Sequence, residues 1–296
     1  MVREANAIDF WRGFALVTIF INHIPGIYFE RFTHRNISIS DSAELFVFLA
    51  GWALRLLYNH LGVTQGVRYV LHRIASRALT IYAAHLMLIC LAIAMLATAA
   101  YVYDNPLFLE WYNAAGVFYD PMRAHMGLVA LTYQLGYFDI LPLYVVLMAV
   151  VAPLTVILHG YVPRLLLPIA ICLYVIIMVW QISLPTWPTD GHWFFNPLAW
   201  QLVFVLGFVL AGDGGLGGAI RRHMTAVRLV AWPIVIASAI VVVFELWPDP
   251  VNMPEPKLFF MSWKSFATPP RLLQFLALVA AISALFPYIR RMAPAL

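Results

Sequence analysis

Long apolar runs recur along the whole chain, and few charged residues interrupt them. Each run is long enough, or nearly so, for a helix to cross the roughly 30 Å hydrocarbon core of a bilayer. The alternating apolar and polar pattern of an outer-membrane barrel is absent from the sequence. The chain is therefore predicted to be all-α, a polytopic transmembrane helix bundle embedded in a lipid bilayer. We expect about eight spans, at residues 8–27, 43–58, 78–100, 139–158, 164–184, 197–211, 228–246 and 271–288.

The composition supports this fold class and excludes several functions. Of the 296 residues, 63% are hydrophobic and 11% are charged, against about 25% charged in a soluble domain. No basic patch is interleaved with stacking aromatic residues, so no nucleic acid is expected as a partner. Cys90 and Cys172 both lie in apolar runs, and no CxxC motif or metal-ligand spacing is present. We therefore expect neither a metal nor a bound cofactor.

The distribution of basic residues predicts the orientation. With the N-terminus in the cytoplasm, twelve of the 18 Lys and Arg residues fall on the cytoplasmic side of the expected spans. The other six are Arg31, Arg35, Arg123, Lys257, Lys264 and Arg271. This asymmetry agrees with the positive-inside rule and places both termini in the cytoplasm. The two longest loops, 101–137 and 247–270, would then lie outside.

The first expected span carries ionisable residues at both ends. Arg12 and His23 are eleven residues apart, which is three helical turns, so both side chains leave one face about 16 Å apart. Asp9 lies close to the same face. An ionisable residue costs about 2.5–3.5 kcal/mol at the centre of a span and tends to face the protein interior, so the pair indicates a functional site. Alternatively, Arg12 extends to the lipid headgroups and His23 lies at the far interface.

The second expected span is short. Residues 45–57 make only about 20 Å of helix, so either the segment is re-entrant or Glu44 and Arg55 are drawn into the membrane. A carboxylate beside the helix that carries His23 suggests that Glu44 pairs with this histidine. The alternative is that Glu44 belongs to the N-terminal cap of a helix that follows Ser40-Asp41-Ser42.

Further polar groups precede or enter the third span. Arg73 and Arg77 are one helical turn apart, which suits a phosphate-bearing ligand, although cytoplasmic flanking also explains them. His85 is interpreted as a buried, hydrogen-bonded histidine rather than a catalyst. The loop 101–137 is rich in Trp and Tyr. These aromatic residues suit a carbohydrate surface, but residues at a membrane interface have the same composition.

Four segments resemble a known family. They are Asp9-Phe-Trp-Arg12-Gly-Phe-Ala-Leu with Asn22-His23-Ile-Pro-Gly26, Ser40-Asp-Ser-Ala-Glu44-Leu-Phe-Val-Phe-Leu-Ala-Gly51, Arg77-x4-Tyr82-x2-His85, and Phe195-Asn-Pro-Leu-Ala-Trp200-Gln201. The Arg12-x10-His23 spacing resembles the signature of the acyltransferase-3 superfamily, and the residues of the first two segments resemble those of its OpgC-like branch. The resemblance covers essentially the whole chain.

The resemblance implies an O-acyltransferase of the bacterial inner membrane. The donor would be cytoplasmic acyl-CoA, succinyl-CoA or acetyl-CoA, and the acceptor a hydroxyl of a periplasmic glucan or another envelope carbohydrate. His23 would act as general base, since neutral imidazole has a suitable pKa, with Glu44 orienting it. Arg12, Arg73 and Arg77 would hold acyl-CoA. The residues expected in support are Asp9, Asn22, His85, Trp200 and Gln201.

The same resemblance leaves alternatives open. Family members usually have about ten spans, so residues 1–296 are expected to form one integral-membrane acyltransferase domain, which leaves room for a missing C-terminal helical hairpin. Acetyl transfer to another envelope glycan is the nearest alternative. A transporter with His23, Glu44 and His85 as a proton relay belongs to a different class, and so does a non-catalytic scaffold. Against a transporter, the two halves show no related pair of Gly- or Pro-broken helices.

Overall fold

The computed structural model describes residues 7–285 and 288, and their secondary structure is helical. No strand occurs among these residues, where only one isolated bridge joins Pro185 to His192. The α-helices are α1 (Ala7–Asn22), α2 (Ser42–Leu57), α3 (Val63–Gln65), α4 (Val67–Val102), α5 (Ala115–Tyr119), α6 (Pro121–Val129), α7 (Ile140–Val146), α8 (Ala152–Tyr161), α9 (Leu166–Trp180), α10 (Pro197–Leu210), α11 (Gly215–Arg222), α12 (Met224–Val243) and α13 (Pro269–Ile282). Two π-helical turns, Tyr58–Gly62 and Leu147–Val151, follow α2 and α7. Short 3-10 segments are Tyr28–Phe32, His34–Ile37, Pro106–Asn113, Pro250–Asn252 and Lys257–Phe259.

The expected number of spans is confirmed only in part. Every expected span corresponds to a helix. In the described part of the chain, however, only four helical segments are long and apolar enough to cross a membrane: Ser42–Gly62, Val67–Val102, Ile140–Tyr161 and Met224–Val243. A fifth is obtained if α10 and α11, bent by 68°, are counted as one broken span. The helices α9 and α13 are apolar but shorter. The structure is therefore that of a helical membrane protein, and the count of eight is not established.

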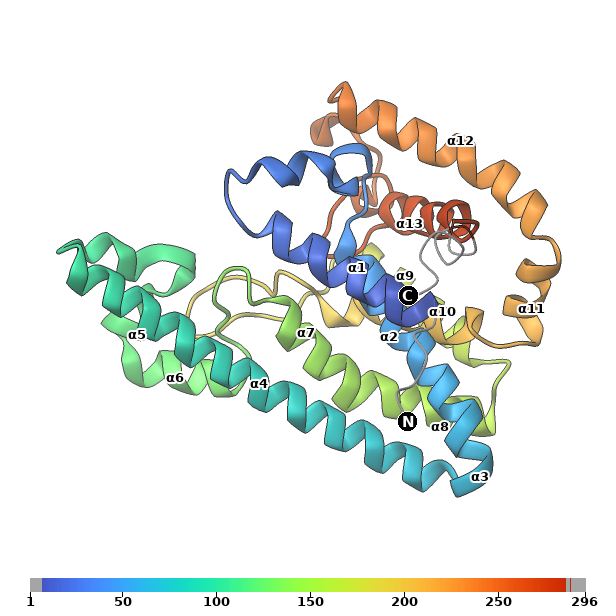
Figure 1. The fold of residues 1–296 in the computed structure, drawn as a ribbon, viewed down its shortest axis with the longest axis horizontal. Helices are drawn as coiled ribbons and strands as arrows, with labels where there is room; N and C mark the ends of the chain where they lie inside the picture. Colours follow the sequence, from blue (N-terminus) through green and yellow to red (C-terminus); the bar gives the residue numbers. More distant parts are fainter. Residues whose placement is uncertain (1–6, 286–287, 289–296) are drawn as a thin grey trace.

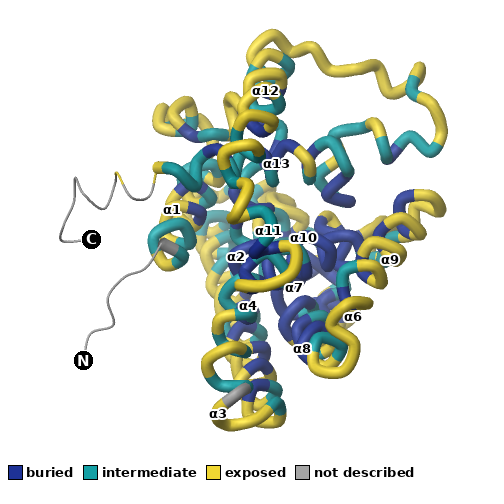
Figure 2. The backbone as a smooth tube through the Cα atoms, turned by 90° about the vertical axis from the view of Figure 1, so that its right-hand side faces the viewer, coloured by how far each residue is buried: buried dark blue, intermediate teal, exposed yellow. Residues whose placement is uncertain are grey.

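The centre of the bundle is the contact between α2 and α10. Each helix places a glycine against the backbone of the other, Gly51 beside the carbonyl of Phe204 and Gly207 beside the carbonyl of Phe48. A Cβ atom at either glycine would collide with that carbonyl, so only glycine permits this approach. Close packing over small residues is a common way for helices to associate in a membrane. Figure 2 shows that buried residues concentrate in this part of the structure.

The second span is a continuous helix rather than a re-entrant loop. After α2 the π-helical turn carries the helix on to Gly62, so the segment Ser42–Gly62 has 21 residues. Glu44 and Arg55 both lie within it. The sequence underestimated the length of this span because the polar residues that appeared to bound it are part of the helix.

The third span is also longer than expected. Helix α4 has 36 residues and begins at Val67, so it is about 54 Å long and exceeds the hydrocarbon core. Arg73 and Arg77 are therefore helical and exposed. The helix runs along one edge of the molecule and packs against α7 and α8 (Figure 1).

Helix α1 lies across the bundle with one face against α2. Its residues Ala15 and Thr18 are buried, and the hydroxyl of Thr18 lies 2.5 Å from that of Ser42 at the start of α2. Residues on the opposite face, such as Val17 and Phe20, are exposed. This contact orients the two polar ends of α1, because Arg12 precedes it and His23 follows it.

Candidate active site

Two polar cavities lie at the two ends of α1. The outer cavity has a volume of about 510 Å³ and contains Ile19 and Asn22 of α1 and His23, which directly follows it. Its other walls come from residues 38–43, residues 136–140, Phe194 and Phe195, Lys264, and Arg271. The inner cavity has a volume of about 480 Å³ and contains Ile8, Asp9 and Arg12 of α1 with residues of α2 and the following turn. These two names follow the orientation predicted from the basic residues, in which the Arg12 end of α1 faces the cytoplasm.

His23 is held in one tautomer by the backbone. Its Nδ1 atom lies 2.6 Å from the carbonyl oxygen of Ile19. A carbonyl only accepts hydrogen bonds, so Nδ1 carries the proton and Nε2 of the neutral ring is left with a free lone pair. The ring of Tyr137 packs edge-on against the imidazole with centroids 5.0 Å apart. His23 is therefore oriented and exposed to the cavity, as a general base has to be.

A cluster of paired charges lies on the opposite wall. Lys264 contacts Asp41 at 2.5 Å, and Arg271 contacts Asp41 at 3.7 Å. Burial alone would raise the pKa of Asp41, but the charges of Lys264 and Arg271 outweigh it and hold that pKa well below its usual range. Asp41 is therefore ionised, and the cluster keeps two cations fixed beside the cavity.

Glu44 belongs to this cluster and does not pair with His23. Its carboxylate accepts a hydrogen bond from Arg271 Nε at 2.8 Å, forms an ion pair with Arg271 Nη2 at 2.6 Å, and accepts from the backbone N–H of Asp41 at 3.0 Å. The side chain of Asp41 in turn accepts from the N–H of Ala43 at 2.8 Å, which completes a capping box at the start of α2. Glu44 is fully buried. The capping alternative is thus correct, and the expected pairing with His23 is wrong, since no hydrogen bond joins the two among the described residues.

A hydrogen-bonded network fixes the chain that leads to this cluster. Gln274 of α13 accepts from the N–H of Ser40 at 3.0 Å and donates to the hydroxyl of Ser38 at 2.8 Å. The N–H of Ile39 donates to the hydroxyl of Ser238 of α12 at 3.0 Å. Residues 38–40 are therefore held from two helices that are distant in the sequence.

Trp200 and Gln201 support the site from a distance. The buried indole of Trp200 donates from Nε1 to the carbonyl of Lys264 at 3.1 Å, so it fixes the loop that presents this lysine. Gln201 donates to the carbonyl of Ala170 at 2.8 Å and joins α10 to α9. The ammonium of Lys264 also lies over the ring of Phe195, 5.3 Å from its centroid.

Asp139 is a second carboxylate on the wall of the outer cavity. It directly precedes α7, outside the span, and burial raises its pKa to about 6, an effect that the charge of Lys264 reduces only in part. The side chain can therefore hold or release a proton near neutral pH. On the wall formed by α1, the Oδ1 atom of Asn22 is buried and has no hydrogen-bond partner.

The inner cavity is simpler. Arg12 is half-buried and lies with Asp9 opposite Leu56, Leu57 and His60, of which His60 belongs to the π-helical turn after α2. Helical turns of this kind often occur at functional sites. Arg73 and Arg77 do not line this cavity. They lie on α4, which packs against α7 and α8 and against the π-helical turn that carries His60.

A third, apolar cavity of about 280 Å³ follows α1 between the two ends. Phe10, Trp11 and Phe14 of α1 form one wall and Phe275 of α13 forms another. Its polar end contains His34, whose pKa is lowered by burial, and Asp41, which also lines the outer cavity. The apolar cavity thus extends from the early turns of α1 to the charged cluster.

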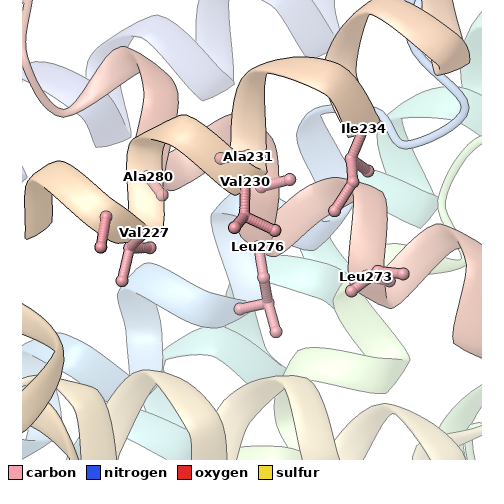
Figure 3. A pocket seen from close by; sticks show the side chains of 9 residues that line it. Val227, Val230, Ala231, Ile234, Leu273, Leu276 and Ala280 are labelled. Carbon is pink, nitrogen blue, oxygen red and sulfur yellow. The ribbon is translucent and has the colours of Figure 1, made fainter.

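His85 does not contribute to any of these cavities. It is 0% exposed, as expected of a buried histidine, but both of its ring nitrogens have no hydrogen-bond partner. The expectation of a hydrogen-bonded histidine is therefore wrong. An open groove of about 450 Å³ between α12 and α13 is lined by nine apolar side chains (Figure 3). It offers no group for acid–base chemistry, so the outer cavity is the better candidate.

The sequence did not identify three residues of the outer cavity: Lys264, Arg271 and Asp139. The sequence shows Lys264 and Arg271 only as positive charges on the non-cytoplasmic side of the expected spans. One signal was available, since Arg271 follows Pro269-Pro270 at the start of an apolar helix, where a charged residue requires a partner. Asp139 similarly stands at the first turn of an apolar run.

Comparison with known proteins gives one match. The sequence model of the family described as OpgC protein matches residues 3–295, which is nearly the whole chain. No curated protein and no solved structure matches.

Proposed function

This chain belongs to the OpgC protein family, and we propose that it transfers a succinyl group from cytoplasmic acyl-CoA to a hydroxyl of a periplasmic glucan. Family membership and the apolar helices indicate a membrane transferase that modifies glucans with acyl groups. The observation that carries the finer proposal is the pair of polar cavities at the two ends of α1, with Arg12 in the inner cavity and His23 in the outer cavity.

The reaction requires one base and one site for negative charge. Nε2 of His23 removes the proton from the glucan hydroxyl, whose oxygen attacks the thioester carbonyl carbon. The C–S bond then breaks, and the thiolate of CoA takes up the proton carried by the imidazolium. Lys264 and Arg271, on the opposite wall, supply positioned N–H donors for the oxyanion that forms during the attack, while Asp41 and Glu44 balance their charges. The products are the glucan ester and free CoA.

The donor enters from the side of Arg12. This guanidinium binds a phosphate of CoA in the inner cavity. Succinyl rather than acetyl is supported by Arg35 on the wall of the outer cavity, since its exposed guanidinium can face a free carboxylate. The protein would lie in the bacterial inner membrane with both termini in the cytoplasm, as the distribution of basic residues predicts.

His23→Ala provides the test. A general base contributes about 10²–10⁴-fold to a rate, so the variant is expected to lose transfer by this factor and still bind acyl-CoA. Membranes that contain either variant or the wild type receive radiolabelled succinyl-CoA or acetyl-CoA, and the label in periplasmic glucan is measured per folded protein. The matched control is His85→Ala, which is expected to change stability and not the rate per folded molecule. Near-normal transfer by His23→Ala would exclude this histidine as the base.

A further inference from the structure

A continuous series of aromatic rings leads away from His23 over the outer loop. Tyr137 contacts His23, and the ring of Tyr112 follows with its centroid 5.3 Å from that of Tyr137. The series continues to Trp111 at 6.1 Å, then to Phe108 at 4.6 Å and to Tyr103 at 5.8 Å. We call Tyr137, Tyr112, Trp111, Phe108 and Tyr103 the aromatic track. It begins at the proposed base and ends at the C-terminal end of α4.

The aromatic track is open to solvent along most of its length. The exposed fraction is 53% for Tyr137, 51% for Trp111 and 71% for Tyr103. Two exposed carboxylates adjoin the rings in sequence, Asp104 beside Tyr103 and Glu110 beside Trp111. In Figure 1 the end of α4 lies with α5 and α6 at one edge of the molecule, on the side toward which α1 runs.

The backbone under the aromatic track is fixed in an unusual conformation. Tyr112 and Tyr137 have positive φ values of 56° and 68°, which cost free energy for residues other than glycine. The N–H of Gly136 donates to the carbonyl of Tyr112 at 2.7 Å and joins the two segments directly beside the Tyr112–Tyr137 pair. Asn113 Nδ2 donates to the carbonyl of Gln134 at 2.9 Å. Strained backbone that its surroundings hold in place is common at ligand sites.

We propose that the aromatic track is the binding site of the acceptor glucan and that successive sugar rings occupy it up to His23. The C–H face of a pyranose ring is apolar and stacks on aromatic side chains, while its hydroxyls remain free to bond to carboxylates and water. Several rings in series suit a chain of several sugars better than a monosaccharide. This inference rests on the proposed function for the identity of the acceptor. A membrane-interface belt would need no ordered contact between rings or with His23.

The test measures sugar binding without any acyl donor. Purified full-length protein in detergent is titrated calorimetrically with linear glucose oligosaccharides of one, three and six units, in α- and β-linked series. We expect the affinity of the wild type to rise with length in at least one series. In Trp111→Ala the affinity for the six-unit sugar should fall about tenfold, as for other aromatic stacking platforms, with little change for glucose. Trp111→Phe keeps a stacking surface and is expected to restore most of the loss.

The matched control is Tyr101→Ala. Tyr101 is 88% exposed at the end of α4 but makes no ring contact with the aromatic track, so its removal should leave sugar affinity unchanged. Equal losses in Tyr101→Ala and Trp111→Ala would indicate a membrane-interface role and overturn the proposal. Affinity independent of sugar length would overturn it as well. If long sugars bind through Trp111 but receive no acyl group, the aromatic track is supported and the proposed function fails. If acyl transfer to glucan does not depend on Trp111, the proposed function is supported and the aromatic track fails.

Discussion

The outer cavity is assembled from the whole chain, whereas the inner cavity needs only α1 and α2 with the turn that follows. In the outer cavity the pair Arg271–Glu44 joins residues 227 positions apart in the sequence. In the inner cavity Arg12 and Asp9 face a single neighbouring helix and the following turn. One site therefore depends on the complete fold and the other on one helix pair.

The charged cluster of the outer cavity is more deeply buried than the charged residues of the inner cavity, because more elements of the fold surround it. Glu44 and Arg271 are held in the protein interior at hydrogen-bond distance, so the cationic guanidinium of Arg271 is held in place before any substrate arrives. Such preorganised charge is what stabilises a developing oxyanion. Arg12 is only half-buried, which suits the capture of a charged donor from water. The comparison suggests that the outer cavity performs the chemistry and the inner cavity performs the binding.

The largest expected effect is that of breaking the charged cluster. Arg271→Ala would leave Glu44 buried without its cation, and loss of one partner of a buried pair costs about 3–5 kcal/mol of folding free energy. We expect a large drop in the thermal midpoint of the purified protein in detergent. Arg123→Ala is the matched control, because Arg123 forms a 3.9 Å pair with Asp120 on the surface.

A second variant distinguishes an unpaired charge from lost packing. In Glu44→Gln/Arg271→Gln both charges are absent, so we expect the midpoint to recover much of what Arg271→Ala loses. If the double variant is as unstable as Arg271→Ala, the instability comes from lost packing of the side chains and not from an unpaired buried charge. The distinction between the two cavities would then lose its electrostatic basis.

A smaller effect is expected at the inner cavity. Arg12→Ala removes one phosphate contact and should raise the KM for acyl-CoA by the equivalent of about 1–3 kcal/mol, with kcat nearly unchanged. Arg73→Ala and Arg77→Ala are the controls, since both arginines are exposed on α4 and do not line this cavity. Initial rates at varied donor concentration measure the difference. Equal KM changes in all three variants would place the donor along α4 and contradict the assignment of the inner cavity.

What the sequence predicted depends on how local the contacts are. The helical spacing of Arg12 and His23 follows from residues on one helix, and the structure places the two in separate cavities at its ends. The cap formed by Asp41 and Glu44 is also local and was recognised as an alternative. The partners of these carboxylates were not predicted, because Lys264 and Arg271 come from the last quarter of the chain. No periodicity or spacing relates such distant residues. The packing of α13 against α2 places Arg271, and the hydrogen bond from Trp200 to the loop before α13 places Lys264.

The smallest effect concerns Asp139 and depends on pH. Its pKa is raised from 3.8 to about 6 by burial, so the folded state favours the protonated form. The stabilisation that protonation provides is complete below about pH 4 and is lost as the pH rises through 6. Asp139→Asn removes this dependence, so its thermal midpoint should match the wild type in acid and exceed it at pH 8. The full shift corresponds to about 3 kcal/mol, and the partial exposure of the side chain reduces the expected difference to about 1–2 kcal/mol. Asp190→Asn, at an exposed position between α9 and α10, is the control and should give no pH-dependent difference. A constant difference between Asp139→Asn and the wild type from pH 4 to 8 would show that Asp139 is solvated, and the outer cavity would then be less desolvated than its other charges indicate.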